Sequence, residues 1–351
     1  MTVDSIGLSD LPRAPLSHWA EEISDNQPAG SAVLQELTGN DRAMAKMLMR
    51  HMRRCLSRGL SVVCLGVAAI LPAAAGPLEM PAITSPATTE HLPGKVIWRD
   101  LETTHLARAK KFYSGLLGWD FRDYHADGVD YAVAMQGAGP VAGILQRRIR
   151  KGEERPSAWL PLIAVRDIDA AVSTALQHHA QIDSEPENLP LRGRQALLTD
   201  PEGVRFGILA SSSGDPPDTA VAPGTWLWTA LVARDSGDEA VFYQQVFGYT
   251  LLGMPTNVGL ERIRLSSDGQ ARISVSAMPA DAASLHPYWI SFVRVANATE
   301  TVARALKLGG RVVLNVQRND RGDQSAVLAD PTGARFGITE SASTGVATPA
   351  P

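Results

Sequence analysis

The sequence predicts an α+β fold of four β-α-β-β-β modules that form two tandem copies of one domain. The first observation is a nonapeptide written twice, DPEGVRFGI at residues 200–208 and DPTGARFGI at residues 330–338. The second is that other landmarks keep the same spacing of 130 residues: Phe112-Tyr113 and Phe242-Tyr243, Gly118-Trp119 and Gly248-Tyr249, Trp98 and Trp228, Trp159 and Trp289. The third is that each copy contains two helical patterns, each followed by short alternating runs. A fixed period without net insertion indicates a tandem duplication.

The first module shows the pattern from which the others are interpreted. Residues 95–101 alternate and are rich in β-forming side chains, which predicts a strand. Apolar residues at helical spacing predict a helix over residues 105–117, with Thr103 or Thr104 as its N-cap and Gly118 at its end. Three strands are predicted after this helix, near residues 119–124, 131–136 and 141–146.

The second module and the second copy repeat this order. A strand at residues 159–165 precedes a helix at residues 167–179, for which Asp167 is the predicted N-cap. Three strands follow, near residues 181–183, 195–199 and 204–209. The second copy is predicted to contain strands at residues 226–232 and 288–295, helices at residues 237–247 and 298–308, and further strands up to residue 339.

The bulk composition is that of a globular protein with a small negative charge. The chain has 351 residues, of which 44% are hydrophobic, and its formal net charge is −4. No basic stripe is present, so a nucleic-acid partner is not expected. Its two cysteines, Cys55 and Cys64, precede the repeats, which excludes disulfide and thiolate chemistry from the repeated part.

A basic patch between Arg50 and Arg58 precedes an uncharged run at residues 60–75, which ends in small residues. This order is typical of a secretory signal peptide, although an uncleaved membrane anchor and a buried helix remain alternatives. We therefore expect export to the periplasm or beyond, or anchoring by residues 60–75, and no other membrane contact. The predicted organisation is a polar, largely disordered extension (1–59), the signal or anchor segment (60–75), a proline-rich linker (76–94), domain 1 (95–210), a second linker (211–223), domain 2 (224–340) and a disordered tail (341–351).

The paired modules, the aromatic-glycine exit of the first helix in each copy and the DPxGxxFGI strand together resemble the vicinal oxygen chelate superfamily. That superfamily includes glyoxalases, extradiol dioxygenases and bleomycin-binding proteins. The resemblance covers roughly residues 95–210 and 224–340, and it implies that each pair of modules surrounds one cleft. It also implies a divalent metal, held by His, Gln or Glu side chains from the first and last strands of the modules.

The positions that match those metal ligands carry other residue types. They fall on Trp98 and Trp228, at or beside Leu160 and Ile290, on Gly207 and Gly337, and at or near Gln146 and Ser276. None is His, Asp or Glu, so neither a metal nor another cofactor is expected. A substitute set of ligands at Asp100, Glu102 and His105 is an alternative, which competes with a solvated loop at a helix N-terminus. His178-His179 at a helix end and His286 in a loop are weaker candidates of the same kind.

Six side chains are candidates for contact with a ligand in place of a metal. Four tryptophans stand early in their strands, where they could stack on a planar ligand or fill the space that a metal would occupy: Trp98, Trp159, Trp228 and Trp289. Arg205 and Arg335 lie two residues before the glycines of the RFGI motif, on the same face of the strand. Either could hold an anionic ligand or form a surface ion pair. Gln146 and Tyr131 are weaker candidates, and no catalytic residue is identified.

Three functions follow from these observations. The first is a metal-independent small-molecule binder, comparable to the drug-sequestering members of the superfamily. The second is a metal-dependent lyase or dioxygenase of the glyoxalase type with non-standard ligands, which rests on the resemblance alone. The third is a structural or interaction module whose sheets form a docking surface. A homodimer is compatible with each, since the superfamily pairs its domains both within and between chains.

Overall fold

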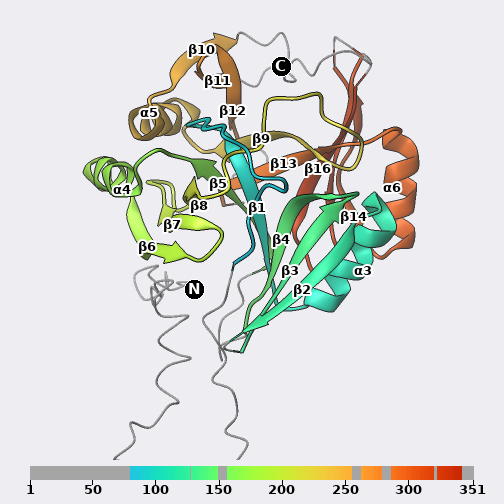
Figure 1. Ribbon diagram of the computed structural model, residues 1–351. Helices are drawn as coiled ribbons and strands as arrows, with labels where there is room; N and C mark the ends of the chain where they lie inside the picture. Colours follow the sequence, from blue (N-terminus) through green and yellow to red (C-terminus); the bar gives the residue numbers. More distant parts are fainter. Residues whose placement is uncertain are drawn as a thin grey trace, which may run out of the picture.

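A computed structural model of the chain describes residues 80–126, 128–148, 156–254, 262–278, 286–319 and 322–341. These residues form two halves with the same order of strands and helices, which confirms the predicted α+β fold of four modules (Figure 1). The expected signal or anchor segment at residues 60–75 lies outside this part of the chain. Within it, no helix is both long enough and apolar enough to cross a membrane.

The described residues of each domain form eight strands and two helices. Those of domain 1 are β1 (Val96–Thr103), α3 (Leu106–Leu117), β2 (Asp120–Ala126), β3 (Val129–Gln136), β4 (Gly139–Gln146), β5 (Ala158–Ala164), α4 (Ile168–Gln177), β6 (Gln181–Leu189), β7 (Gly193–Thr199) and β8 (Arg205–Ser211). Those of domain 2 are β9 (Trp226–Ala233), α5 (Ser236–Phe247), β10 (Thr250–Met254), β11 (Arg262–Ser267), β12 (Gln270–Ala277), β13 (Tyr288–Arg294), α6 (Ala298–Lys307), β14 (Arg311–Arg318), β15 (Gln324–Ala329) and β16 (Arg335–Glu340).

The two modules of each domain share one eight-stranded sheet. The strand order is β2-β3-β4-β1-β5-β8-β7-β6 in domain 1, and β10-β11-β12-β9-β13-β16-β15-β14 in domain 2. The first strand of each module pairs in parallel with the last strand of the same module, and the two first strands pair antiparallel at the centre of the sheet. The centre of each sheet is therefore the junction between two modules.

Three of the four described helices begin with a short polar side chain that accepts a hydrogen bond from the first turn, which the sequence predicts for Asp167. Asp167, Asp235 and Asn297 cap α4, α5 and α6. Helix α3 differs, because neither Thr103 nor Thr104 is its N-cap. Instead, Gln146 at the end of β4 accepts from the backbone N–H of Leu106 through its side-chain Oε1, at 2.9 Å.

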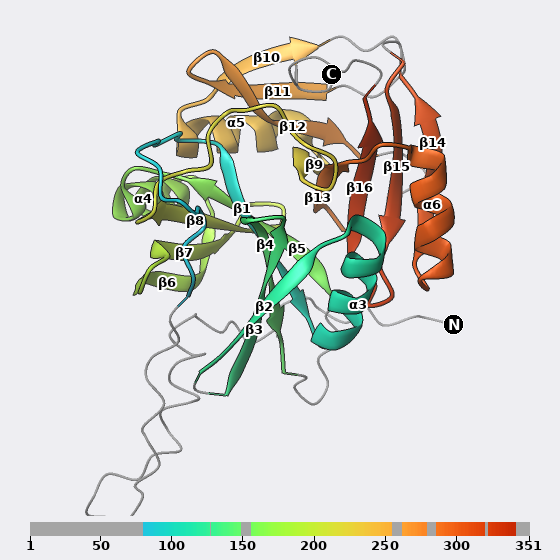
Figure 2. The same ribbon diagram turned by 45° about the vertical axis from the view of Figure 1, so that its right-hand side comes forward.

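The helix-bearing faces of the two domains pack against each other. Helix α3 contacts α6, and α4 contacts α5, as both views of the ribbon show (Figures 1 and 2). One large apolar core consequently joins the first and fourth modules, from Leu101 to Ile338. The other joins the second and third modules, from Ile163 to Val275. These two cores are shared between the domains, so domain 1 and domain 2 form one body.

The repeated motifs contact each other across this interface. The hydroxyl of Tyr113 in α3 donates to Asp330 of the second DPxG turn at 3.1 Å, and the hydroxyl of Tyr243 in α5 donates to Asp200 of the first at 2.9 Å. The aromatic residue that follows each helix reaches across as well, since Trp119 donates to the carbonyl of Gly224 and Tyr249 to that of Gly94. The duplication therefore produces reciprocal contacts about an approximate two-fold axis.

Residues 80–94, which the sequence predicts as a free linker, pack on the folded body. We call these residues the strap. Met80 and Ile83 are buried against the sheet of domain 1 because the apolar side chains there are otherwise uncovered. Thr84 and Thr88 bond to Ser213 of the second linker.

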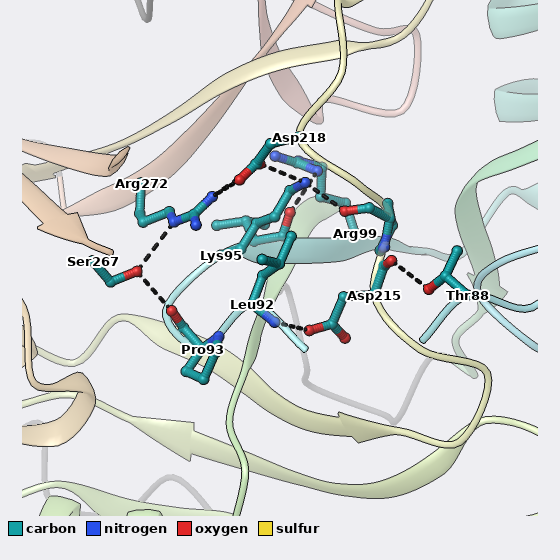
Figure 3. A network of polar contacts seen from close by, with 11 residues as sticks. Thr88, Leu92, Pro93, Lys95, Arg99, Asp215, Asp218, Ser267 and Arg272 are labelled. Carbon is teal, nitrogen blue, oxygen red and sulfur yellow. Dashed lines mark hydrogen bonds and ion pairs between the residues drawn. The ribbon is translucent and has the colours of Figure 1, made fainter. Parts of the chain in front are cut away.

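The end of the strap is held by a polar network that also reaches domain 2 (Figure 3). Asp215 accepts from the backbone N–H of Leu92, and Ser267 donates to the carbonyl of Pro93. Lys95 and Arg272 both bind Asp218, at 2.8 and 2.7 Å. Hydrogen bonds and ion pairs therefore hold the strap and the second linker together.

Candidate functional site

The face of each sheet that carries no helix is the candidate site, and we call it the open face. Side chains alternate along a strand, so every second residue of the central strands lies on it. In domain 1 these residues include Trp98, Asp100 and Glu102 of β1, whereas Leu101 between them faces the helices. The equivalent residues in domain 2 are Trp228, Ala230 and Val232 of β9, with Leu231 facing the helices.

The open face of domain 1 is filled by a buried polar cluster. Trp98 Nε1 and the Tyr131 hydroxyl both donate to Asp100 Oδ1, at 2.9 and 2.6 Å. The guanidinium of Arg192 lies 4.9 Å from the centre of the Trp98 ring, donates to the Tyr131 hydroxyl at 2.8 Å and lies 3.6 Å from Asp100 Oδ2. Burial alone would lower the pKa of Arg192, but Tyr131 and Asp100 outweigh it and raise that pKa.

The strap completes this filling. Arg192 Nε donates to the carbonyl of Pro81 at 3.1 Å, so the strap supplies an acceptor that the sheet lacks. Met80 and Ile83 pack with Trp98 and Leu160 on the same face. Since Arg192 and Trp98 are both fully buried, these atoms leave no room beside them for a ligand.

A second cluster lies farther along the open face of domain 1. Arg205 of β8 bonds to Glu102 of β1 at 2.7 Å and to Asp183 of β6 at 2.5 Å. Burial would lower the pKa of Arg205, but the two carboxylates outweigh burial and raise it. The sequence singles out Arg205 as either an anion-binding residue or an ion-pair partner, and the structure shows the ion pair.

The positions that correspond to metal ligands in the superfamily do not fit a divalent metal. A side chain at Gly207 would begin 2.8 Å from Leu162, and one at Gly337 would overlap the ring of Phe292. Trp98 and Trp228 occupy the first-strand positions, and neither indole offers a lone pair to a metal. Within the described residues, no three His, Cys, Asp or Glu side chains gather as a metal site would require.

The substitute ligand set does not come together either. Asp100 forms an ion pair with Arg192, and Glu102 forms one with Arg205, while His105 is exposed at the start of α3. Gln146 is occupied by the backbone around the start of the same helix.

Among the described residues, nothing fills the open face of domain 2 as the polar cluster and the strap fill that of domain 1. Trp228 bonds to Ser274 Oγ at 3.0 Å in place of an acid. Its four buried apolar residues are surrounded by half-exposed ones, among them Tyr288, Phe292 and Val232. The strap packs on domain 1, and no described residue outside domain 2 joins this apolar cluster.

The cations of this face also differ from those of domain 1. Arg335 corresponds to Arg205, but its only described partner is the ring of Tyr288, whose centre lies 5.0 Å from the guanidinium carbon. Arg262 stands on β11 at the place that Tyr131 occupies on β3, as the pairing of each with the following strand shows. Burial lowers the pKa of Arg262.

The structure separates the four tryptophans into two kinds. Trp98 and Trp228 lie on the open faces. Trp159 and Trp289 lie instead in the cores between the domains, where Trp159 donates to the Tyr113 hydroxyl at 2.9 Å. They stand opposite Leu101 and Leu231 in the central strand pair, which places them on the helix side.

Sequence reasoning did not single out Arg192, Arg262, Tyr288 and Phe292. The two copies carry different residues at these places, and that difference is the signal by which a position-by-position comparison of the copies could have found them.

Comparisons with known proteins agree with this architecture. Residues 99–208 match the glyoxalase/bleomycin resistance protein/dioxygenase superfamily, and residues 228–339 match a glyoxalase-like domain. A protein of Mycobacterium tuberculosis named "Putative glyoxylase CFP32" is 29% identical over 73% of this chain and 98% of its own. The anthracycline biosynthesis protein DnrV of Streptomyces peucetius is 25% identical over 72% of this chain and 95% of its own.

Among solved structures, the Mn(II)-bound glyoxalase from Novosphingobium aromaticivorans superimposes with a TM-score of 0.53, at 16% identity over 71% of this chain and 82% of that one. That likeness concerns the fold. The two family matches, the module order and the paired sheets together show that this chain belongs to the glyoxalase/bleomycin resistance/dioxygenase, or vicinal oxygen chelate, superfamily and contains two of its domains in tandem.

Proposed function

We propose that this chain binds a small molecule without a metal, and that the open face of domain 2 is the binding site. The observation that carries the proposal is the contrast between the two open faces. In domain 1, residues of the chain itself cover the open face, namely the buried polar cluster and the strap. In domain 2, Phe292 is half-exposed opposite Trp228, and Tyr288 is half-exposed four residues away on β13.

Half-exposed aromatic rings are suited to a planar ligand. Each ring that a ligand covers removes apolar surface from water, which contributes about 25 cal/mol per Å². Phe292 and Trp228 stand opposite each other on neighbouring strands, so one ligand can contact both. Polar groups around them, such as Ser274, would then orient the ligand rather than supply the binding energy.

Independence from metal is supported by the residues at the former ligand positions of domain 2. Trp228, Ile290 and Gly337 offer no electron pair to a cation, and Phe292 covers the last of them. The descriptions of the relatives, a glyoxylase and an anthracycline biosynthesis protein, are also consistent with small-molecule recognition.

A fluorescence titration tests the proposal. The neutral probe N-phenyl-1-naphthylamine is titrated into the full chain, once with and once without a chelator, and the dissociation constant is measured. We expect one saturable site, the same affinity in both conditions, and a loss of about tenfold in Phe292→Ala because a covering ring is removed.

The matched control is Leu162→Ala, which truncates the corresponding residue in the filled face of domain 1. It should lower stability while leaving probe affinity unchanged. Loss of binding on chelation, or a Phe292→Ala variant that binds as the parent does, would contradict the proposal.

A further inference from the structure

The two open faces differ in charge along one row of side chains. The strand register places Arg262, Ser276, Val232 and Tyr288 side by side across β11, β12, β9 and β13. The corresponding row in domain 1 is Tyr131, Leu145, Glu102 and Ala158. The second copy has therefore exchanged an acid for valine at the centre of the row and gained an arginine at its end.

The same exchange affects the cation that lies over the row. Arg205 is held by Glu102 and Asp183 in domain 1. The residues at these places in domain 2 are Val232 and Val313, so Arg335 has lost both carboxylates. At the place of Arg205, domain 1 thus has one cation and two anions, whereas domain 2 has Arg335 and no anion from the matching positions. Arg262 adds a second cation at the other end of the row.

No described carboxylate replaces the missing partners. The guanidinium carbon of Arg335 lies 5.0 Å from the centre of the Tyr288 ring, and that ring offers no carboxylate to the N–H donors. Arg262 is partly buried and makes no ion pair with a described residue. Partly buried cations without a counterion are costly, and an anionic ligand would offset that cost.

On β9 and β13, apolar residues continue from this row in one direction. Two residues along lie Ile290 and Ala230, beside Ser274 of β12 and Arg264 of β11, and two further lie Phe292 and Trp228. Four residues of a strand span about 13 Å, which is close to the length of a bicyclic aromatic molecule with one substituent. The charged row and the aromatic pair therefore stand at the two ends of such a molecule.

We propose that the ligand of domain 2 is a planar aromatic anion, whose acidic group is bound by Arg335 and whose rings lie on Phe292 and Trp228, with Arg262 at the far end of the row adding positive potential. This inference rests on the proposed function, since it names the class of molecule that the same face accepts. A carboxylate or sulfonate suits the fork of Arg335 because two parallel hydrogen bonds form.

A pair of probes that differ only in charge tests the inference on the full chain. 8-Anilinonaphthalene-1-sulfonate carries the ring system of N-phenyl-1-naphthylamine and adds one sulfonate. We expect the sulfonate to bind at least tenfold more tightly than the neutral probe at low salt, at one site per chain, with that advantage shrinking as salt is raised. Phe292→Ala should weaken both probes.

Two variants locate the charge, and two others serve as their controls. Arg335→Met keeps the apolar stem and should remove most of the advantage of the sulfonate. Val232→Glu gives Arg335 the acid that Arg205 has and should remove the advantage while leaving the arginine in place, whereas Val232→Leu should preserve it. Arg304→Met, on the exposed side of α6, makes the same change in net charge as Arg335→Met and should have no effect.

The outcomes separate the two proposals. Equal affinities for the two probes, or tighter binding of the sulfonate probe that survives Arg335→Met, would overturn the proposal of an anionic ligand. The proposal of a binding site on domain 2 would still stand. Failure of both probes to bind, or binding of both that survives Phe292→Ala, would overturn the site as well. Circular dichroism of each variant confirms that lost affinity is not lost folding.

Discussion

Glu239 of α5 and Asp200 of the first DPxG turn are two carboxyl groups in contact within the core that joins the second and third modules. The Tyr243 hydroxyl donates to Asp200, while Glu239 Oε2 is buried without a hydrogen-bond partner among the described residues. Burial and the neighbouring Asp200 raise the pKa of Glu239 to about 9, and burial raises the pKa of Asp200 to about 6. The residue at the place of Glu239 in the other half is Ala109, so the pair occurs once.

This pair predicts that stability falls as pH rises. Because the folded-state pKa of Glu239 lies above its unfolded value of about 4.3, the folded chain binds the extra proton between these two values. The free energy of unfolding should therefore decrease from pH 5 towards pH 9, with Glu239 contributing at most about 1.4 kcal/mol per pH unit and Asp200 adding to the decrease up to about pH 6. In Glu239→Gln the decrease should be much smaller, because the amide does not ionise.

Urea unfolding at several pH values measures this effect. Asp238→Asn, an exposed acid on the same helix, serves as the control and should keep the slope of the parent. A Glu239→Gln variant whose stability varies with pH as the parent does would refute the assignment.

At the scale of elements, the first helix of each domain (α3 or α5) is hydrogen-bonded to the DPxG turn of the other domain. The two hydrogen-bonded contacts differ in extent. Tyr113 donates to Asp330 and accepts from Trp159, so three side chains are linked in series. Tyr243 donates to Asp200, but Trp289 Nε1 is buried without a hydrogen-bond partner. The contact at α3 is therefore the more extensive one.

We predict that Tyr113→Phe destabilises the fold more than Tyr243→Phe. Loss of the Tyr113 hydroxyl leaves both Asp330 and Trp159 short of a partner, which costs about 1–3 kcal/mol. Loss of the Tyr243 hydroxyl removes one bond and leaves Trp289 as it was. The free energies of unfolding of the two variants decide the matter, and equal losses would refute the difference.

The elements were largely predictable because their signals are local. Asp167 stands directly before its helix, and Gly118 follows α3 with the positive φ of 74° that a left-handed end requires. The start of α3 was not predictable in this way, since its acceptor, Gln146, lies 40 residues later. The strap was also misjudged, because proline-rich composition does not reveal an uncovered apolar face elsewhere.

The candidate site was predictable in part for a related reason. Strand alternation correctly placed Arg205 and Arg335 on the face of the RFGI glycines. It could not show that Arg205 has two acid partners and that Arg335 has none among the described residues, because β1 and β6 approach β8 only through the sheet order. Trp159 was placed near a ligand by its equivalence to the other tryptophans, whereas the pairing of β5 with β1 sets it on the opposite face.

At the scale of the molecule, the shared cores predict that neither domain is stable alone. If the chain is divided within residues 219–223, each half exposes the apolar face of two helices. Halves produced separately should aggregate or remain unfolded, whereas halves produced together should associate into one folded species.

Size-exclusion chromatography with circular dichroism distinguishes these outcomes. A control chain with a protease site in the same linker, cut after folding, should stay associated. A separately produced half that is monomeric and unfolds cooperatively would contradict the prediction.

One of the two tyrosine–aspartate hydrogen bonds lies inside the other in the sequence, and this order has a consequence for synthesis on the ribosome. Asp200 and Tyr243 are 43 residues apart, whereas Tyr113 and Asp330 are 217 residues apart. At a synthesis rate of about 5–20 residues per second, Tyr243 follows Asp200 within about 2–9 s, so this hydrogen bond can form early. Tyr113 of α3 must wait about 10–40 s until Asp330 has been synthesised. The nascent chain thus closes from the middle outwards, and the first module to leave the ribosome is the last to be buried.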